Sequence, residues 1–588
     1  MHRPIETSPR APGRGERVSG VAHMISTALT RPRIWRTTLP RGVPAWAVAV
    51  AVAVAGLVVA PLVSLVLTAL SADLSGWARL AADVLPVALM ETASLLLGVA
   101  VVTGVVGIGT AWLVTAHCFP GRRVLAWLLP LPLAVPAYIT AYIYVEIFDA
   151  AGPVQMALRG WLGFRSRGEY WFPEIRSLGG CILVMSAVLY PYVYLSARAM
   201  FLTQSACMME VARTLGAGRF ELFRTVALPL ARPALAVGLS LALLEALNDI
   251  GASEYLGVRT LTVSIYTTWL NRGSLGGAAQ IACVMLVVVL GLIWLERHGR
   301  ADRRYGLSTR RPRVAQPTPL TPGGGLLAAL ACAIPVALGF GLPFGFLVRE
   351  IMSRGLVAQI DAAFLRHLGT TVGLAFAATL AALALAVVVV TAARFARHRL
   401  TEATRAIAGV GYAVPGTVLA LGLLGPLVTF DEGLNAVWRW ATGGRLGLVV
   451  MGSAAGLVIA YVIRFLPIAT GSLGAGLDRV SAGIEDAART LGARPRELVM
   501  RVQLPLLRPA LASAGLLVFV DTLKELPATL LLRPLNVETL ATLVYGHASR
   551  GAFEDGALAA MVIVLVGLWP VMRLTRGAEA RMRAAPAG

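Results

Sequence analysis

Long apolar runs separated by short polar segments occupy the sequence from residue 44 to residue 575. A helix that crosses the hydrocarbon core of a bilayer needs about 20 apolar residues. Helices are expected because lipid offers no partner to the backbone groups of an open strand. The predicted fold is therefore all-α and polytopic, with about 12 transmembrane helices at 44–70, 89–116, 124–148, 179–201, 233–252, 278–296, 325–348, 370–393, 405–428, 446–470, 509–531 and 556–574.

Composition supports a membrane protein. Hydrophobic residues make up 57% of the chain and charged residues 14%, whereas soluble domains average about 25% charged residues. The formal net charge of +21 would suggest nucleic acid in a soluble protein. Here the arginines cluster between apolar runs, and aromatic-basic interleaving and zinc-finger spacings are missing from the sequence. We therefore expect contact with membrane lipid and no nucleic-acid partner.

The arginine clusters predict the orientation. They fall between spans two and three, four and five, six and seven, eight and nine, and ten and eleven, and after span twelve. Positively charged loops stay in the cytoplasm, so we expect a bacterial inner-membrane protein with both termini cytoplasmic. Residues 1–43 are interpreted as an Arg-rich cytoplasmic tail rather than a cleaved signal peptide, and residues 576–588 as a second cytoplasmic tail.

The chain contains an internal duplication. Val211-Ala-Arg-Thr-Leu-Gly-Ala217 is repeated as Ala487-Ala-Arg-Thr-Leu-Gly-Ala493, and a Leu-Pro pair follows each copy at the same offset of 276 residues. Val135-Pro136 also pairs with Val414-Pro415. The sequence thus predicts two parallel six-helix repeats, 44–296 and 325–575, related by an axis along the membrane normal. The Arg-, Pro- and Gly-rich segment 297–324 is predicted to be a flexible cytoplasmic linker.

A polar loop after the fourth helix of each repeat has the pattern of a short amphipathic helix that ends at a glycine. A Leu-Pro pair then leads into the next span. The residues that define the two loops are Glu210, Ala212, Gly216, Leu228 and Pro229 in the first repeat, and Glu485, Ala487, Ala488, Gly492, Leu504 and Pro505 in the second.

These two loops resemble the EAA loop of ABC-importer permeases. The resemblance covers about residues 44–575 and implies that each loop is a coupling helix that docks on an ATPase subunit. Val211 stands where that family usually has Ala, which leaves docking plausible. A P-loop requires Gly-Lys-Ser or Gly-Lys-Thr, and the only lysine is Lys524. We therefore expect a separate ATPase chain, in two copies, and no enzymatic activity here.

Polar and charged residues occur inside two predicted spans, where each charge costs at least about 2.5 kcal/mol. Their spacing places them on one helix face, and the acidic positions match at the 276-residue offset. Three interpretations stay open: ion pairs that brace the helices, a gate or lining of the substrate path, or direct ion coordination. The residues are Glu245, Asn248 and Asp249 in span five, and Asp521, Lys524 and Glu525 in span eleven.

Other kinds of site find no support in the sequence. The five cysteines form no CxxC pair and the histidines form no HExxH motif, so no disulfide, metal site, catalytic group or cofactor is expected. Two other classes of protein fit the sequence less well. An ion-driven secondary transporter would not explain two matched docking loops, and a membrane enzyme lacks a catalytic constellation.

The substrate is suggested by a closer resemblance. Leu247-Asn-Asp-Ile-Gly-Ala252 and Asp521-Thr-Leu-Lys-Glu-Leu-Pro-Ala-Thr-Leu530 are similar to segments of the ferric-iron ABC permeases, in which two halves are typically fused as here. This resemblance implies Fe(III) delivered by a periplasmic binding protein. Fused thiamine permeases and aminophosphonate permeases share the loop and the duplication, so these substrates remain alternatives.

Overall fold

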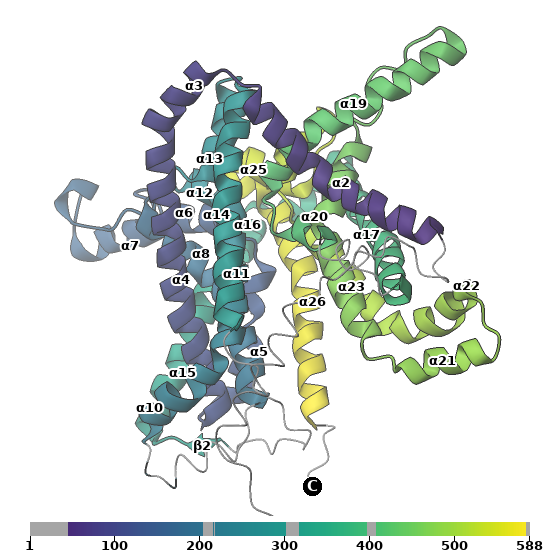
Figure 1. Cartoon of the computed structure of the whole chain (residues 1–588). Coiled ribbons are helices and arrows are strands. Elements are labelled where there is room, and N and C mark those ends of the chain that lie inside the picture. Colours follow the sequence, from purple (N-terminus) through teal and green to yellow (C-terminus); the bar gives the residue numbers. More distant parts are fainter. Residues whose placement is uncertain are drawn as a thin grey trace, which may run out of the picture. The chain divides into compact units, whose positions relative to one another are not determined.

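The computed structural model describes residues 45–203, 214, 216, 218–301, 317–396 and 407–583. These residues are almost entirely helical, as predicted (Figure 1). The predicted N-terminal tail, 1–43, lies outside them. Of the predicted C-terminal tail, residues 576–583 continue the last helix.

The first repeat contains long helices joined by short helices and turns. In chain order its elements are α2 (Ala45–Leu70), α3 (Leu74–Arg79), η1 (Leu80–Val84), α4 (Leu85–Ala116), β1 (His117–Cys118), α5 (Arg122–Leu128), η2 (Leu131–Ala134), α6 (Ala137–Phe148), α7 (Pro153–Leu162), η3 (Arg167–Glu169), α8 (Leu178–Thr203), α10 (Arg219–Leu222), η4 (Phe223–Ala227), α11 (Leu228–Asn248), α12 (Gly251–Tyr255), α13 (Leu261–Tyr266), η5 (Thr267–Asn271) and α14 (Leu275–Ala301).

The second repeat follows a similar order. Its elements are β2 (Thr318–Pro319), α15 (Pro322–Val336), η6 (Ala337–Gly341), α16 (Leu342–Arg354), η7 (Leu356–Gln359), α17 (Ala362–Ala396), η8 (Val410–Tyr412), α19 (Gly416–Thr442), α20 (Ala454–Leu477), α21 (Ala482–Thr490), α22 (Pro495–Glu497), η9 (Leu498–Gln503), α23 (Leu504–Leu523), α24 (Pro527–Leu532), α25 (Leu540–Ser549), η10 (Phe553–Gly556) and α26 (Ala557–Arg583).

The number of membrane spans agrees with the sequence prediction. Eleven helices among the described residues are long and apolar enough to cross a bilayer, and a bent pair raises the number to 12 if it is one span. The bent pair is the third predicted span, where Arg122–Ala134 and Ala137–Leu162 meet at 94°. The prediction of one continuous span over 124–148 was therefore wrong.

Proline explains this bend and a shifted span in the second repeat. Pro136 and Pro415 both have extended backbone, with ψ of 144° and 145°, and each immediately precedes a helix. Proline lacks an N–H and pushes the preceding residue out of the helical region. The ninth span therefore begins at Gly416 and ends at Thr442 rather than covering 405–428.

The fifth and eleventh spans end earlier than predicted. Helix α11 stops at Asn248, not 252, and α23 stops at Leu523, not 531. In both places the chain unwinds and a short helix follows. The Asp249 carboxylate accepts a hydrogen bond from the Ala252 N–H at 2.7 Å, and Glu525 accepts one from the Ala528 N–H at 3.1 Å. Residues 249 and 525 occupy equivalent repeat positions, so the unwinding is duplicated too.

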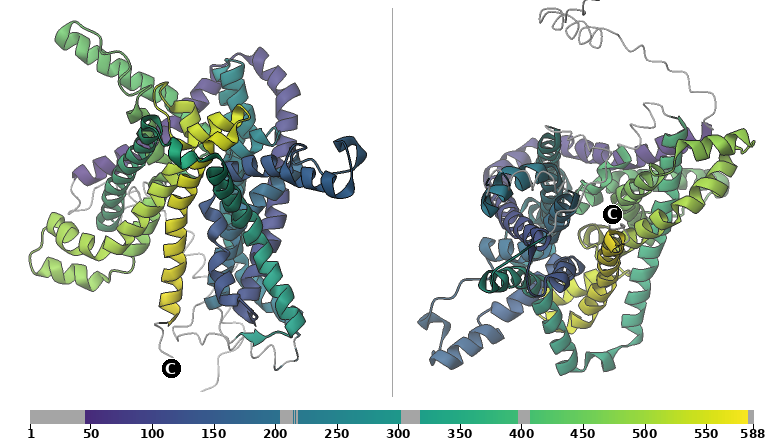
Figure 2. Two further views of the ribbon diagram at one scale, coloured as in Figure 1. Left: turned by 180° about the vertical axis from the view of Figure 1, so that it is seen from behind. Right: turned by 90° about the horizontal axis from the view of Figure 1, so that it is seen from below.

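The first helices of each repeat pack against helices of the other repeat. Helix α2 packs on α19 and α17 of the second repeat, and α15 and α16 pack on helices of the first (Figures 1 and 2). The approach is close, because Gly422 leaves no room for a Cβ against the Pro61 backbone, nor does Gly339 against Ala187. The two repeats are therefore joined by reciprocal helix exchange.

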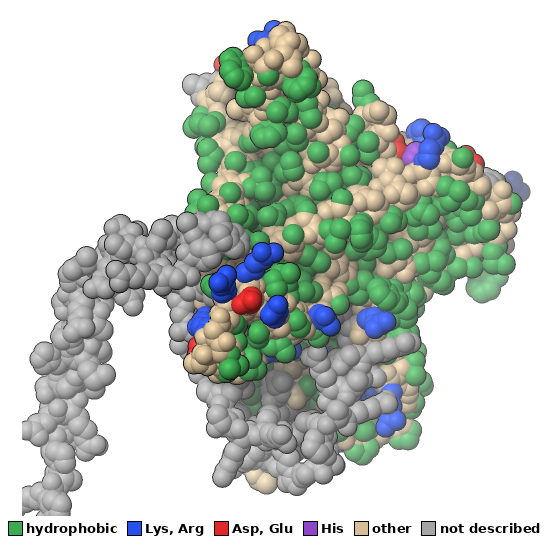
Figure 3. Space-filling view, turned by 90° about the vertical axis from the view of Figure 1, so that its right-hand side faces the viewer, with side chains coloured by type: hydrophobic (Ala, Val, Ile, Leu, Met, Phe, Trp, Pro, Cys, Tyr) green, Lys and Arg blue, Asp and Glu red, His purple; other side chains and the backbone are tan. Residues whose placement is uncertain are grey.

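The exterior fits a bilayer. Apolar side chains such as Leu97, Val105 and Leu290 are more than half exposed. Figure 3 views the side that carries α21 and α22, and shows a mostly hydrophobic surface with basic side chains across its lower half and a second charged group at the upper right. The described part of the chain thus presents lipid-compatible faces with charge near helix ends.

The segment between the repeats is described only in part. Helix α14 continues to Ala301, and residues 302–316 of the predicted linker lie outside the described residues. Thr318 and Pro319 pair in parallel with His117 and Cys118, the one strand pair in the described ranges. The end of the predicted linker is therefore anchored beside α4.

Candidate functional site

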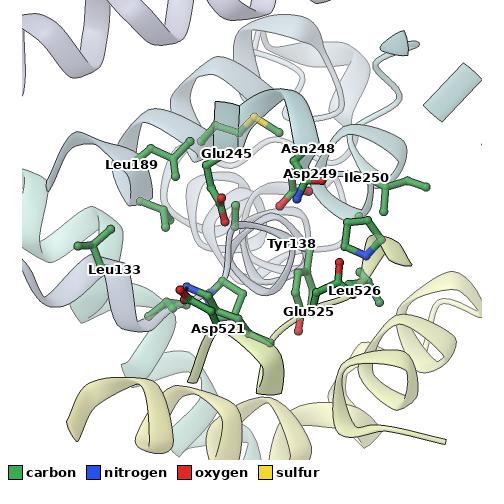
Figure 4. A pocket seen from close by; sticks show the side chains of 18 of the residues that line it. Leu133, Tyr138, Leu189, Glu245, Asn248, Asp249, Ile250, Asp521, Glu525 and Leu526 are labelled. Carbon is green, nitrogen blue, oxygen red and sulfur yellow. Dashed lines mark ion pairs between the residues drawn. The ribbon is translucent and has the colours of Figure 1, made fainter. Parts of the chain in front are cut away.

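One cavity brings together all six charged and polar residues that the sequence predicted inside spans five and eleven. Glu245, Asn248 and Asp249 come from the end of α11, and Asp521, Lys524 and Glu525 from the end of α23 (Figure 4). Residues of η2, α6, α8, α12, η8, α20 and α24 also line the cavity. The cavity is small, with a volume of about 70 Å³.

The acidic residues of the second repeat have cationic partners. Lys524 Nζ lies 3.0 Å from Asp521 Oδ1, and Arg464 Nε lies 3.8 Å from Glu525 Oε1. Glu525 also accepts the backbone N–H of Thr529 at 3.1 Å and its hydroxyl at 2.9 Å. The Lys524–Asp521 pair lies at the end of a single helix, whereas the Arg464–Glu525 pair joins α20 to the residues that follow α23.

The first repeat is different. Among the described residues, no cationic side chain lies within ion-pair distance of Glu245 or Asp249, which share the cavity. The complete lining holds four carboxylates and two cationic groups. The cavity therefore has a formal excess of two negative charges, concentrated on the side of α11.

Arg464 was missed by the sequence analysis, although a charged residue within the predicted span 446–470 was a usable signal. It comes from α20 and is buried. Its Nη1 donates to Asn248 Oδ1 at 3.1 Å, and the Gly416 N–H donates to the same oxygen at 2.7 Å. Asn248 therefore accepts hydrogen bonds from the second repeat and ties the two halves together at the cavity.

Tyrosines add polar groups that the sequence did not single out. Tyr138, Tyr192 and Tyr412 line the cavity. Tyr138 is 3% exposed, and its hydroxyl has no hydrogen-bond partner among the described residues. A buried hydroxyl without a partner costs free energy, so Tyr138 offers an unused donor or acceptor beside Asp249 and Glu525 (Figure 4).

The cavity is not a preformed metal site. Within the described ranges, no group of three or more His, Cys, Asp or Glu side chains is arranged to hold a metal ion. Two carboxylates are engaged by Lys524 and Arg464 in this conformation.

A further contact joins the repeats near the cavity. The Tyr545 hydroxyl donates to Glu254 Oε2 at 2.7 Å and lies 3.3 Å from the Tyr266 hydroxyl. Tyr266 and Tyr545 stand 279 residues apart, the same offset that separates Pro136 from Pro415. Burial raises the pKa of the Glu254 carboxyl. Symmetry-related tyrosines thus meet at the boundary between the halves.

The second predicted coupling loop is described completely. Helix α21 carries Glu485, Ala487 and Ala488, and Gly492 follows with φ +84°. Ile484 is 46% exposed and Leu491 is 88% exposed, so an apolar surface projects from this loop. The glycine conformation is the one expected for a residue that ends a helix.

Glu485 has a different environment from the one expected of a docking residue. It is 4% exposed, pairs with Arg394 Nε at 3.3 Å and accepts from Gln503 Nε2 at 3.1 Å. Arg394 Nη2 also donates to the Val480 carbonyl at 3.2 Å. Glu485 therefore fastens α21 to the end of α17, and the neighbouring exposed residues are those available to a partner.

Only part of the first loop is described. Glu210 and Ala212 lie outside the described residues, whereas Gly216 has φ +86°, close to the value of Gly492. Both Leu-Pro pairs, Leu228-Pro229 and Leu504-Pro505, form the first turn of a helix just after a π-helical turn. They lead from each loop into α11 or α23.

A duplicated helical bundle, a charged cavity lined by both repeats and a loop that leads into a cavity-lining helix are the features of a membrane transport protein built from two halves. The family model described as binding-protein-dependent transport system inner membrane component matches residues 104–304 and 389–584. These matches cover more than half of the chain, which therefore belongs to this family.

Known relatives transport several solutes. The chain is 25% identical to the Fe(3+)-transport system permease protein FbpB 2 of Haemophilus influenzae over 82% of this chain and 88% of the relative. It is 30% identical to the molybdenum transport system permease protein ModB of Escherichia coli over 33% of this chain and 86% of that protein. A putative 2-aminoethylphosphonate permease of Salmonella typhimurium is 33% identical over 28% of this chain and 57% of its own length.

Membership of this family decides between an ABC permease, a secondary transporter and a membrane enzyme. The chain is a multi-pass inner-membrane permease of an ABC importer, and it works with an ABC ATPase and a periplasmic binding protein. It is a channel subunit rather than an enzyme. An ion-gradient-driven secondary transporter is therefore set aside.

Proposed function

We propose that this permease imports ferric iron, which a periplasmic binding protein delivers. The charge of the cavity carries the proposal. Four carboxylates outnumber Arg464 and Lys524 by two charges, and buried charges of one sign favour a ligand of the other sign. A cationic cargo fits this lining, whereas an oxyanion such as molybdate, sulfate or a phosphonate would be repelled.

Similarity supports the same substrate. The relative named as an Fe(3+) permease aligns along both repeats, whereas the molybdenum and aminoethylphosphonate permeases each align with about a third of the chain. The hard oxygen donors of the lining suit a hard cation. Thiamine and aminophosphonates are the alternatives against which iron is tested.

We further propose that the loops at Glu210–Gly216 and Glu485–Gly492 each dock on one ATPase subunit, so that two copies bind. The exposed Ile484 and Leu491 suit an apolar groove on such a partner. Because Arg394 and Glu485 tie α21 to α17 and the Leu-Pro turns lead into α11 and α23, movement of the loops would reach the cavity. The proposed cycle opens the cavity outward when ATP brings the loops together, and hydrolysis resets it.

The proposed orientation places both termini and both loops in the cytoplasm, on the basis of the arginine clusters. A fluorescent reporter that folds only in the cytoplasm, fused after residue 588, should fluoresce. An alkaline phosphatase fusion at the same place should be inactive. The opposite pair of results would reverse the orientation and remove the loops from reach of an ATPase.

The substrate is tested by transport. The permease is reconstituted in proteoliposomes with its ATPase and binding protein, and uptake of radiolabelled Fe(III) is measured with ATP inside. We expect ATP-dependent uptake that excess molybdate, thiamine and 2-aminoethylphosphonate do not inhibit. ATP-dependent uptake of one of those solutes, without iron uptake, would contradict the proposal.

A further inference from the structure

We infer that Arg464 is a tethered substitute for the cargo: its guanidinium occupies a hard-cation site formed by Glu525, Asn248 and Tyr138, and it leaves that site when a cation passes. The inference rests on the proposed function, because it assigns a binding position within the same cavity. It goes further by naming the ligands and the group that blocks them.

Arg464 breaks the symmetry of the repeats. Its equivalent at the 276-residue offset is Val188, which also lines the cavity. The helix start beside it differs in the same sense, because Gly416 stands where the first repeat has Ala137. A Cβ on Gly416 would lie 2.8 Å from both Arg464 Nη1 and Glu525 Oε1. The second repeat thus pairs an arginine with the space needed to hold it.

The Arg464 guanidinium is incompletely hydrogen-bonded. Its contact with Glu525 is an ion pair at 3.8 Å, and Nε makes no hydrogen bond among the described residues. Arginine can make two parallel hydrogen bonds to a carboxylate, yet here it does not. The Glu525 oxygens also accept three hydrogen bonds, from Ala528 and Thr529, at 2.9–3.1 Å. The guanidinium at 3.8 Å is therefore their loosest contact and the one that a competing cation would displace.

The guanidinium is surrounded by oxygen donors. Glu525 and Asn248 supply carboxylate and amide oxygens, and the unpartnered Tyr138 hydroxyl lies in the same lining (Figure 4). Asp249 also belongs to this lining. Oxygen donors of this kind are the preferred ligands of hard cations.

The consequence is a path that is closed to free cations in this conformation. Arg464 neutralises Glu525 and bonds across the repeats to Asn248. Separation of α11 from α20 would break the Asn248 contact and release the site to cargo. An arginine cannot be deprotonated in a protein, so only movement removes it.

The inference is tested by cation capture on the full-length chain in nanodiscs without nucleotide. The probe is gallium(III) nitrilotriacetate, a redox-inert hard cation, and retained gallium is measured by mass spectrometry after gel filtration. Arg464→Gln should retain gallium at least tenfold more tightly than the wild type. Adding Glu525→Gln to it should abolish the gain. If Arg464→Gln does not fold, Arg464→Met is used in its place.

Lys524→Gln is the matched control, because it removes one cavity cation but leaves Arg464 on Glu525. It should capture less gallium than Arg464→Gln. Equal capture by both variants would mean that overall charge matters and the site is wrong. No capture by a folded Arg464 variant, or capture that survives Glu525→Gln, would also overturn the inference.

The test separates this inference from the proposed function. If the wild type imports iron and Arg464→Gln captures no gallium, only the inference fails. If Arg464→Gln captures gallium through Glu525 but the wild type imports no iron, the cation site stands and the choice of iron fails.

Discussion

At the scale of single residues, the two repeats share some cavity positions and differ at others. Equivalent positions 249 and 525 keep a carboxylate that caps the following short helix. Positions 188 and 464 differ, with a valine in one repeat and an arginine in the other. Both repeats thus break the helix at the same position, but they differ in the charge of a few side chains.

We predict that position 416 tolerates no side chain larger than the hydrogen of glycine. In Gly416→Ala the Cβ would crowd Arg464, Glu525 and the Ala528 N–H, which should destabilise the protein by about 1–3 kcal/mol and reduce uptake. Gly471→Ala is the matched control, because nothing lies within 4 Å of that position in α20. It should be neutral or stabilising by up to about 1 kcal/mol. Melting temperature and uptake are measured, and equal melting temperatures would refute the crowding.

The buried pair between Arg394 and Glu485 gives a second residue-level prediction. Glu485→Met should cost about 3 kcal/mol, near the low end for a buried pair, because it strands a guanidinium that is only partly exposed. The double change with Arg394→Met should recover much of that loss. Asp486→Ala, which removes an exposed pair with Arg489, should cost under about 1 kcal/mol. Denaturation measured in detergent checks the order, and a double variant worse than the single one would contradict it.

At the scale of elements, the coupling loop of the second repeat is connected to the cavity-lining helix α23. Helix α21 is held to α17 by Glu485, and the chain then passes through the π-helical turn η9 into α23. The far end of α23 carries Asp521 into the cavity. The same order of π-helical turn, Leu-Pro pair and helix leads to Glu245 in the first repeat.

The glycines of the two loops should be needed for coupling. Gly216 and Gly492 have φ near +85°, a region that β-branched residues rarely adopt. Gly216→Val and Gly492→Val should insert normally but lower substrate-driven ATPase activity and uptake several-fold, because the exposed loop surface is displaced. ATPase activity of the assembled transporter is measured against Gly483→Ala, an exposed position in α21 with open space. Full coupling in both valine variants would rule out the docking assignment.

At the scale of the whole molecule, reciprocal exchange of the first helices holds the repeats together. Helix α2 depends on α19 for much of its packing, and η6 approaches η2 and α8. Gly422 and Gly339 allow those contacts at backbone distance. The interface between repeats is therefore part of the core rather than a surface added later.

Because the first helices are exchanged between the repeats, we predict that assembly and transport do not need the peptide connection between them. Fragments 1–309 and 310–588, expressed together, should co-purify and retain ATP-dependent uptake. Each fragment alone should be degraded, because α2 or α15 would lack its partner. Gly422→Val should abolish co-purification by crowding Pro61, whereas Gly433→Val, in open space on the same helix, should not. Stable single fragments that do not associate would contradict this view of the interface.

The sequence by itself determined the properties that follow from local pattern. Apolar length gave the number of spans, and the 276-residue offset gave the duplication. The same pattern grouped Glu245, Asn248 and Asp249 with Asp521, Lys524 and Glu525, because residues one turn apart share a helix face. Span ends were less accurate, since hydropathy continues through Asp249 and Lys524 while the backbone unwinds there.

The tertiary structure alone decided which distant groups meet. Arg464 lies 61 residues from Glu525 and 216 from Asn248, and no periodicity relates such positions. The turning of Glu485 toward Arg394, the exchange of α2 and α15 between repeats, and the negative excess of the cavity are likewise results of packing. They depend on helix rotation and close approach at glycines, which a linear pattern does not encode.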